Sequence, residues 1–405
     1  MGCSVSRRGS VTVYIMIILT ALCSMLGIFI SSAQQKAVYA GTESLGRLWA
    51  SSIIAEYDRD LLERFGIFAY LGDPHTVDLK LDSYCEKTFA GKSYIKWEGC
   101  SSDIYPFSLA NVSIFKNQIS KAGAEAVIGG ERSLTETYGE ENVSDREIIN
   151  ERLTGSLPSA GRTDNGLLER VKNLIKGLGS ITDIVEQGSD MWLTGKYIDS
   201  HFDSMTRQSA EDDSYLRYEK EYLICGNFSD AANYRGTRNR IVALREVMNI
   251  AFIEADEEMY FLTFAAAEAI ATPALAPVAQ QGIIAAWALA ESVNDYKLLI
   301  NGKRVPLVKD RSSWATDLDS VMNNTSDLYI DPGTDGGDTY DEYLSTLIYL
   351  MDSEIKYLRM MDLIQMDMIY CSNGGFRIGD CYTGVSYTLE VNGEKHEFSD
   401  EYQKS

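Results

Sequence analysis

Apolar residues form a continuous run near the start of the chain and then recur with a helical spacing. Residues 11–31 contain no charged side chain, and about 20 apolar residues are enough to cross the hydrocarbon core of a membrane as a helix. Apolar side chains then recur every four residues up to Phe65, with charged side chains between them. No proline occurs before Pro74, so nothing forces a break. The pattern predicts one continuous helix ending at Phe65, made of a transmembrane segment at 11–31 and an amphipathic stalk at 32–66.

Basic residues flank the apolar run unevenly. Arg7 and Arg8 precede it, whereas the next basic residue is Lys36. Because basic flanks stay on the cytoplasmic side of a membrane, we expect residues 1–10 to be cytoplasmic and the bulk of the chain to be extracytoplasmic. Small residues at 31–33 offer an alternative, in which a signal peptidase removes the helix. The run exceeds the usual length of a signal-peptide core, which favours a retained, single-pass anchor in the cell membrane.

Residues 67–405 carry both helical and hairpin signals. Asn-Gly pairs at 301–302 and 392–393 lie between apolar runs, which is typical of two-residue β-hairpin turns. The Ala-rich run 261–290 is interrupted by charged, amide and proline residues, so it predicts a buried helical hairpin and not a second membrane span. Residues 339–368 predict one amphipathic helix that begins with a capping box.

The predicted fold class is α+β and predominantly helical. A long N-terminal transmembrane and stalk helix is followed by a globular extracytoplasmic domain with short β-hairpins. The chain has 405 residues, of which 45% are hydrophobic, so it can bury a sizeable core. Residues 129–215 are polar, Gly-rich and acidic, and we interpret them as a variable insertion.

Charge excludes one class of partner. The formal net charge is −22, whereas a protein that binds nucleic acid needs a basic surface to contact phosphates. We therefore expect no nucleic-acid partner. The lipid bilayer, met by the N-terminal helix, is the expected partner that follows from the residues themselves.

The seven cysteines form no CxxC pair, which argues against zinc-ribbon and thioredoxin-like sites. Cys371 and Cys381 flank a Gly-rich loop, and Cys85 and Cys100 form a second, similarly spaced pair. In an oxidising compartment each pair is a candidate disulfide. The alternative is unpaired thiols, because spacing alone does not show whether the Cα atoms approach one another.

Residues 331–342 match part of a calcium-binding loop. Asp331, Asp335 and Glu342 fall at the first, fifth and twelfth positions of that pattern, but Gly333 stands where another ligand is expected. The alternative is a solvated turn in which Glu342 caps the helix that follows. The chain contains three histidines and neither an HExxH nor a GxSxG motif. We therefore predict no enzyme and no cofactor.

Segments at both ends of the chain resemble a known family. They are RGSVTVYIMIILTALCSMLGIFISSAQQ (8–35), AEYDRDLLERFGIF (55–68), NRIVALREVMNIAFI (239–253) and two later blocks at 287–309 and 340–365. Together they resemble TadE/TadG-like proteins of Flp (Tad) pilus systems and a large family of anchored Gram-positive proteins associated with them. The resemblance implies a role in pilus assembly or at the cell surface, with protein partners bound through the N-terminal helix.

The same resemblance singles out a processing site. Prepilins are cleaved before their apolar segment, typically after a Gly, and Gly9–Ser10 would be that junction here. Pilins carry Glu at the fifth mature position, whereas this chain has Tyr14, so a terminal ammonium would stay unneutralised in an apolar bundle. The resemblance therefore implies a minor pseudopilin-like or accessory component. The alternative is an anchored enzyme or ligand-binding receptor whose site no motif reveals.

Overall fold

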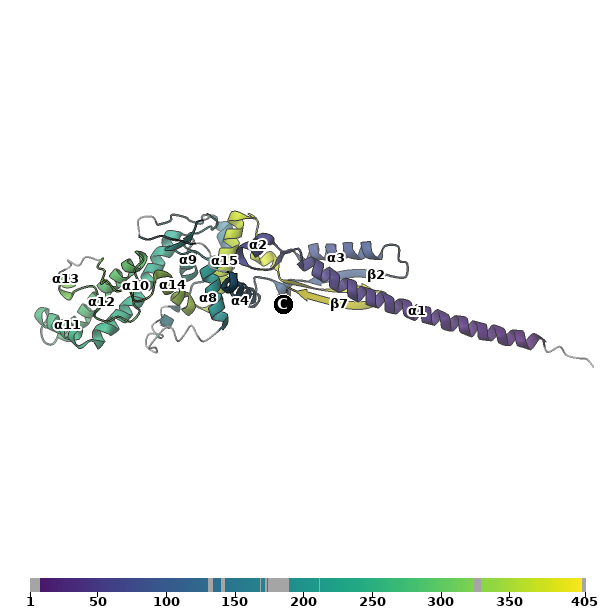
Figure 1. Cartoon of the computed structure of the whole chain (residues 1–405), viewed down its shortest axis with the longest axis horizontal. Coiled ribbons are helices and arrows are strands. Elements are labelled where there is room, and N and C mark those ends of the chain that lie inside the picture. The colour runs from purple at the N-terminus through teal and green to yellow at the C-terminus, as the bar shows by residue number, and fades with distance from the viewer. Residues whose placement is uncertain are drawn as a thin grey trace, which may run out of the picture. The chain divides into compact units, whose positions relative to one another are not determined.

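The computed structural model contains two compact units, which are described separately (Figure 1). The first unit comprises the chain up to Asp58, Phe68–Ser108 and the chain from Asp380 onward; the second comprises Arg59–Ile67 and Leu109–Gly379. The fold is α+β and predominantly helical, as predicted. The structure describes residues 8–129, 134–139, 143–167, 169–171, 173, 189–210, 212–323 and 329–402.

Helix α1 (Arg8–Ile54) dominates the first unit. Every side chain from residue 11 to residue 30 is exposed, and the large hydrophobic ones are between 51% and 70% exposed. The helix is long and apolar enough to cross a membrane. A single face becomes buried in its second half, where the described side chains Thr42, Trp49, Ala50 and Ile53 follow a helical spacing.

The buried face of α1 packs against the antiparallel sheet β2-β6-β7 of the same unit. A Cβ atom at Gly46 would lie only 2.2 Å from the Phe398 ring, so glycine permits the close approach of α1 to β7. The Tyr387 hydroxyl donates to the Gly46 carbonyl at 2.6 Å. Figure 1 shows α1 and α3 running beside the strands. The other elements of this unit are α3 (Pro74–Phe89), β1 (Tyr70–Leu71), β2 (Trp97–Asp103), η1 (Tyr105–Phe107), β5 (Cys381–Tyr382), β6 (Gly384–Val391) and β7 (Glu394–Glu401).

Two sequence-based expectations meet different outcomes in this unit. The hairpin predicted at 392–393 is confirmed: Asn392 and Gly393 have φ of 53° and 78° between β6 and β7, as a two-residue turn requires. The single helix predicted to reach Phe65 is wrong, because α1 ends at Ile54 and α2 (Arg59–Phe65) begins separately. The interruption is four residues long, so the four-residue spacing of apolar side chains continues across it. The Asp58 amide donates to the Ala69 carbonyl at 2.9 Å instead of to a helical carbonyl.

The second unit is a helical assembly built around α15 (Ser353–Cys371). Every residue from Lys356 to Met368 is buried, so this helix passes through the core. The remaining elements are α2, α4 (Val112–Gly129), β3 (Leu134–Glu136), α5 (Glu151–Ser156), α8 (Ser189–His201), β4 (Arg207–Ser209), α9 (Glu219–Cys225), α10 (Asp230–Ala255), α11 (Glu257–Ile270), α12 (Ala276–Ile300), α13 (Leu318–Met322), α14 (Tyr340–Leu350) and, at the end of the unit, η2 (Ile378–Asp380). Described residues of the segment 129–215 contribute to its core, including Tyr197 and Phe202.

The helical hairpin predicted within 261–290 is confirmed, with α11 ending at Ile270 and α12 starting at Ala276. The prediction of a buried hairpin holds only in part, because each of its helices is buried on one side and exposed on the other. Its inner side chains, Met259 and Ala267 among them, pack against Ile283, Ile284 and Trp287 of α12 in a local core.

Two further expectations fail in the second unit. Asn301 and Gly302 do not form a β-hairpin but terminate α12; the Gly302 φ of 78° suits a helix C-terminus as well as a hairpin turn. The helix predicted over 339–368 is two helices, α14 and α15. Asp352 accepts a hydrogen bond from the Ile355 amide at 3.1 Å and so caps a new helix.

Candidate functional site

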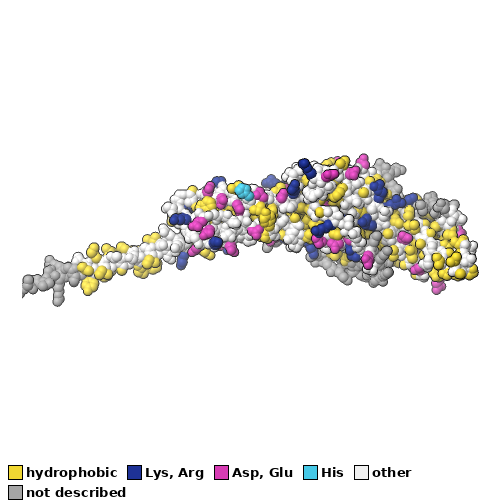
Figure 2. Space-filling view, turned by 180° about the vertical axis from the view of Figure 1, so that it is seen from behind, with side chains coloured by type: hydrophobic (Ala, Val, Ile, Leu, Met, Phe, Trp, Pro, Cys, Tyr) yellow, Lys and Arg dark blue, Asp and Glu magenta, His cyan; other side chains and the backbone are white. Residues whose placement is uncertain are grey.

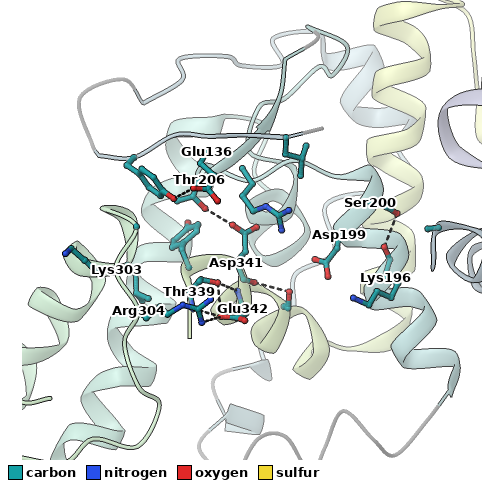
Figure 3. A pocket seen from close by; sticks show the side chains of 18 of the residues that line it. Glu136, Lys196, Asp199, Ser200, Thr206, Lys303, Arg304, Thr339, Asp341 and Glu342 are labelled. Atoms are coloured by element: carbon teal, nitrogen blue, oxygen red, sulfur yellow. Dashed lines mark hydrogen bonds and ion pairs between the residues drawn. The ribbon is translucent and has the colours of Figure 1, made fainter. Parts of the chain in front are cut away.

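An open cavity of about 660 Å³ lies in the second unit and is the candidate ligand site (Figure 3). Its wall combines the last turn of α4, the paired strands β3 and β4, α8, the segment after α12 and the first turn of α14. The predicted capping box holds the start of α14: the Thr339 hydroxyl accepts from the Glu342 amide, and the Glu342 carboxylate accepts from the Thr339 amide at 2.6 Å. Four stretches far apart in the sequence, within 126–138, 196–207, 299–304 and 339–345, therefore meet at this cavity.

Asp341 forms the most buried charge of the cavity wall. Its carboxylate accepts hydrogen bonds from Ser204 at 2.9 Å, from Thr206 at 2.7 Å and from Lys220 at 3.1 Å. Lys220 also donates to Asp199 at 2.9 Å. Burial lowers the pKa of Lys220, but the two carboxylates more than offset this effect and leave that pKa raised. This cluster is charged and satisfied, so it holds β4, α8, α9 and α14 together.

Two cations of the cavity wall lack such partners. Lys196 of α8 and Arg207 of β4 make no ion pair with any described residue, whereas Arg304 lies 3.5 Å from Glu342 and Lys303 lies 2.7 Å from Asp331. The cavity can therefore offer positive charge to a ligand. Glu136 of β3 stands opposite Arg207 in the strand pairing and is engaged by the Tyr138 hydroxyl.

Ser200 and His201 lie beside the cavity but are not arranged for base catalysis. The Ser200 hydroxyl lies 2.8 Å from His201 Nδ1, and Nδ1 also lies 2.9 Å from the Tyr197 carbonyl oxygen. A carbonyl oxygen only accepts hydrogen bonds, so Nδ1 carries the proton in that contact. A protonated Nδ1 does not take a proton from Ser200.

Of the three carboxylates of the partial calcium loop, two already bind other groups of the chain and the third is exposed to solvent. Asp331 accepts from Lys303 and from the Gly333 amide at 2.8 Å, and the Lys303 contact lowers the pKa of Asp331. Glu342 caps α14, and Asp335 is exposed. Among the residues that the structure describes, no cluster of three or more His, Cys, Asp or Glu side chains is placed to hold a metal ion.

The cysteines of both candidate disulfides are thiols in this structure. Cys85 of α3 and Cys100 of β2 have their sulfur atoms 3.5 Å apart, so this pair is brought together as the disulfide hypothesis requires. Cys371 is exposed and donates to the Asp213 carbonyl at 3.1 Å, and Cys381 is buried in the first unit. Gly9 and Ser10, the candidate processing junction, lie in the first turn of α1; Arg7 is outside the described residues.

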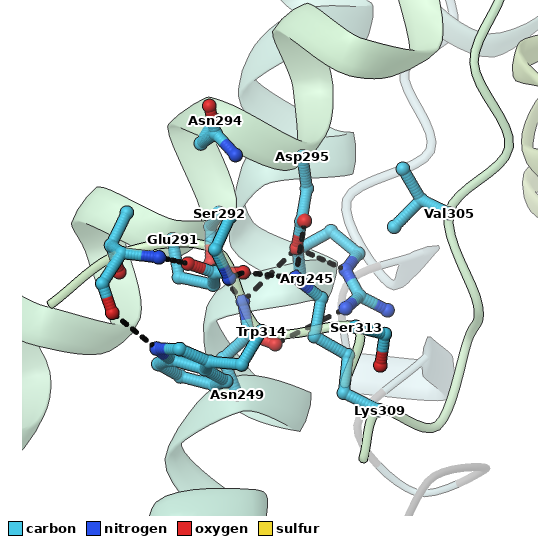
Figure 4. A network of polar contacts seen from close by, with 12 residues as sticks. Arg245, Asn249, Glu291, Ser292, Asn294, Asp295, Val305, Lys309, Ser313 and Trp314 are labelled. Atoms are coloured by element: carbon cyan, nitrogen blue, oxygen red, sulfur yellow. Dashed lines mark hydrogen bonds and ion pairs between the residues drawn. The ribbon is translucent and has the colours of Figure 1, made fainter. Parts of the chain in front are cut away.

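A buried charge network joins α10, α12 and the segment that follows α12 (Figure 4). Arg245 donates to Asp295 at 2.9 Å, and Lys309 contacts Asp295 at 2.6 Å and Glu291 as well. Arg245, Glu291 and Asp295 are 0% exposed and Lys309 is 5% exposed. The network contains two cations and two anions, so it is neutral overall.

Hydrogen bonds satisfy most of the remaining polar atoms of this network. Arg245 donates to the carbonyls of Pro306 and Leu307, at 3.0 and 2.7 Å, and Glu291 accepts from the amides of Ala315 and Thr316 at 3.0 and 2.8 Å. Asn249 bridges Ser292 and Asp295. The network thus holds the irregular segment after α12 against the helices, and its role is structural.

A known protein family matches the part of the chain that contains this network. Residues 132–393 match a family of unknown function, DUF5702. The protein is a member of the DUF5702 family. The DUF5702 match contains the whole buried network, while the exposed apolar part of α1 lies outside it. No curated protein matches the chain, and no solved structure does.

The sequence analysis did not predict this network, although its residues lie in segments that carry the family resemblance. Arg245 and Asn249 lie in the block 239–253, and Asp295 and Lys309 lie in the block 287–309. The available signal is the helical spacing from Ile241 through Arg245 to Asn249, which places a cation on the buried face of α10. A charge at such a position needs a buried partner.

Proposed function

We propose that this DUF5702 protein is a non-enzymatic, single-pass membrane protein with its N-terminus in the cytoplasm and the bulk of its chain outside. Within that role, we propose that it is an accessory, pseudopilin-like component of a Tad/Flp pilus or a related surface assembly. The observation that carries the anchor is the exposure of every side chain of α1 between residues 11 and 30.

The energetic argument for the anchor is direct. Each fully exposed Leu, Ile, Met or Phe side chain gains roughly 1.5–3 kcal/mol on transfer out of water, and this segment has no charged side chain to oppose the transfer. A backbone in hydrocarbon must satisfy its hydrogen bonds internally, and a continuous helix does so. Arg8 before the segment and Lys36 as the next basic residue behind it support the proposed orientation.

Support for the assembly role comes from the second half of α1 and from the family resemblance. The same helix that is exposed at its start packs on β6 and β7 through Trp49 and Ile53, so contacts in the membrane would be transmitted to a folded unit. The Gly9–Ser10 junction supports processing by a prepilin peptidase, and Tyr14 supports an accessory role over a polymerising one.

Two measurements test the parts of this proposal separately. Washing membranes with alkaline carbonate should leave the full chain in the pellet; release into the wash would contradict the anchor. Co-expression with a prepilin peptidase should yield Ser10 as the N-terminus by mass spectrometry, and Gly9→Leu should abolish this cleavage. A chain that keeps its original N-terminus with active peptidase present would contradict the pilus assignment while leaving the anchor intact.

The cavity of Figure 3 favours a second candidate function, an anchored receptor for a small anionic ligand. Lys196 and Arg207 line this cavity and make no ion pair with any described residue. A screen of carboxylates and phosphates by thermal shift should then find a stabilising ligand whose effect is lost in Lys196→Ala/Arg207→Ala. A ligand that stabilises this variant equally would contradict the receptor hypothesis.

A further inference from the structure

Strand β7 runs alongside α1 in the same direction. His396 Nδ1 lies 3.2 Å from the Glu43 carboxylate. Further along β7, the Asp400 carboxylate accepts a hydrogen bond from the Ser51 hydroxyl at 2.7 Å. Four strand residues therefore accompany eight helix residues, which agrees with rises of about 3.3 Å per residue in a strand and about 1.5 Å in a helix. These contacts fix the level of each β7 residue along α1.

The turn between β6 and β7 lies just beyond the apolar run of α1. Counted back from His396 with these rises, the turn at 392–393 lies near the level of Lys36. Lys36 follows the end of the apolar run, residue 31, by about 8 Å along the helix. The turn is therefore next to the point where the apolar surface of α1 ends.

The loop between α3 and β2 is fixed to this turn. The Lys96 amide donates to the Asn392 side chain at 2.8 Å, and the Asn392 side chain donates to the Tyr94 carbonyl at 3.3 Å. Figure 1 shows this loop at the end of the unit that faces the exposed half of α1. We use the name basic tip for three parts of the first unit, which are residues 90–96, residues 392–395 and Lys36.

The basic tip has the opposite charge to the chain as a whole. Its charged side chains are Lys36, Lys92, Lys96, Lys395 and Glu394, four cations and one anion, so its net charge is +3 against −22 for the chain. All four lysines are exposed, and none of them makes an ion pair with a described residue. Figure 2 shows basic side chains where the apolar part of α1 meets the rest of this unit. The fold therefore gathers uncompensated positive charge at this end.

Exposed tyrosines accompany the lysines. Tyr94 of the basic tip is 54% exposed, and Tyr39 of α1, three residues after Lys36, is 52% exposed. Tyrosine is enriched at the headgroup level of membranes, because its ring is apolar and its hydroxyl is polar. Lysine extends its ammonium group toward the same layer. The composition of this end of the unit is that of a membrane–water interface.

We propose that the basic tip rests on the headgroups of the bilayer that holds α1 and binds the phosphate groups of anionic lipids. This inference rests on the proposed anchor. A helix over residues 11–31 spans about 30 Å, so the hydrocarbon layer ends near residue 31 and the headgroups extend roughly 5–7 Å beyond it. That distance brings the headgroups to the level of Lys36 and of the turn.

Charge and position together favour the bilayer as the occupant. An anionic bilayer attracts basic segments beside its surface and repels the acidic remainder of the chain, so contact is confined to the basic tip. An acidic protein could also pair with four lysines. The basic tip lies beside the end of the proposed span, however, where lipid headgroups are already present. The contact would fix the direction in which the chain leaves the membrane.

The test measures lysine reactivity in the full-length protein. The protein is placed in zwitterionic phosphatidylcholine nanodiscs and in nanodiscs that also contain anionic phosphatidylglycerol. A membrane-impermeant succinimidyl ester then acylates exposed lysines, and peptide mass spectrometry gives the rate at each one. We expect Lys92, Lys96 and Lys395 to react several-fold more slowly in the anionic nanodiscs, with the difference lost as salt is added. Lys80, which pairs with Glu56 beyond the other end of α1, should react equally in both.

Charge reversal separates lipid binding from simple crowding near a membrane. In Lys92→Glu/Lys395→Glu, the net charge of the basic tip changes sign, so the remaining Lys96 should react at similar rates in both kinds of nanodisc. The control Lys80→Glu should keep the protection of Lys96. Thermal denaturation of each variant checks that the fold is retained. Protection of Lys96 that persists in the double variant, or equal rates in both nanodiscs for the wild type, would overturn the proposal. Equal rates would leave an acidic protein as the remaining occupant.

Cys23 distinguishes failure of this inference from failure of the anchor. It lies within the apolar run and is exposed in the structure, so a membrane-impermeant maleimide reaches it only if the run is outside the bilayer. A protected Cys23 with unprotected lysines in the basic tip would refute the headgroup contact alone. A reactive Cys23 in the same nanodiscs would refute the anchor and this inference with it.

Discussion

Helix α1 and the α11–α12 hairpin both expose large apolar side chains, yet they do so in different ways. Between residues 11 and 30, α1 is exposed on all sides and carries no charge. Each helix of the hairpin is exposed on one side only and packed on the other, and on α11 Glu257 and Glu268 lie on the same side as the exposed Phe261. A helix with apolar side chains exposed on all sides suits the interior of a lipid bilayer. A helix exposed on one side only, with charged residues beside that side, suits contact with another protein.

Placing charge in the apolar part of α1 should give the largest difference between the two regions, in how firmly the protein is held by the membrane. The double variant Leu19→Arg/Leu22→Arg puts two cations near the middle of the proposed span, each costing roughly 2.5–3.5 kcal/mol of membrane insertion. We expect carbonate washing to release much of this protein. Phe261→Arg in the hairpin should leave membrane retention unchanged. Retention of the α1 variant, or release of the hairpin variant, would contradict the distinction.

The next largest effect concerns the packing that supports the hairpin. Arg245→Met leaves Asp295 buried with one cation fewer, and breaking a buried pair in this way typically costs roughly 3–5 kcal/mol. Chemical denaturation of the detergent-solubilised protein should show this loss. Adding Asp295→Leu should restore part of the stability, because the remaining charges, Glu291 and Lys309, still pair. An unchanged denaturation midpoint in Arg245→Met would show that the network is not structural.

A third effect comes from buried acids of the second unit, which have no counterpart in the exposed part of α1. Burial raises the pKa of Glu221 and of Asp367, each to about 7. A raised folded-state pKa favours folding while the group is protonated, so this stabilisation is complete below the unfolded pKa and is lost as the pH rises toward about 7. We expect the thermal midpoint to fall as the pH increases through this window.

Glu221→Gln isolates one of these groups. The amide oxygen can replace Glu221 Oε1, which accepts from the Met205 amide at 3.0 Å and the Tyr340 hydroxyl at 2.9 Å, while the charge is removed. This variant should be more stable than the wild type at neutral pH, by roughly 1–3 kcal/mol, and its thermal midpoint should depend less on pH. An equal or steeper pH dependence would contradict the assignment.

The smallest expected effect sharpens the contrast between the two sides of the hairpin. Phe261→Ser, on the exposed side, should change the free energy of unfolding by less than about 0.5 kcal/mol. Ile283→Ala, on the packed side, should cost roughly 2–5 kcal/mol. Denaturation curves measured side by side check both values, and a large loss in Phe261→Ser would mean that Phe261 is covered within the chain.

Periodicity predicted the elements whose signals are local. The apolar run of α1, the Asn392-Gly393 turn and the two halves of the α11–α12 hairpin all follow from spacing and turn chemistry. The same reasoning failed where two structures share one signal. Asn301-Gly302 ends a helix because both a helix C-terminus and a tight turn need a left-handed glycine, and a four-residue interruption leaves the apolar spacing before Phe65 unchanged.

The candidate sites were less predictable, for a physical reason. Arg245 meets Asp295 and the Leu307 carbonyl through folding of segments 50 and 62 residues apart, and no local pattern encodes such contacts. The cavity depends likewise on four separate stretches of the chain. Exposure of Phe261 and Val278 was not predictable, because an apolar residue fits a helical pattern whether it is buried or exposed.

The most direct test of the central distinction uses cysteine labelling of the full chain in zwitterionic nanodiscs. Cys23 lies in the exposed apolar part of α1, Cys371 is exposed in the second unit, and Phe261→Cys adds a third position on the exposed side of α11. After treatment with a membrane-impermeant maleimide, peptide mapping should find Cys371 and position 261 modified and Cys23 protected until denaturant is added. Modification of Cys23 in the intact nanodisc, or protection of position 261, would contradict the account.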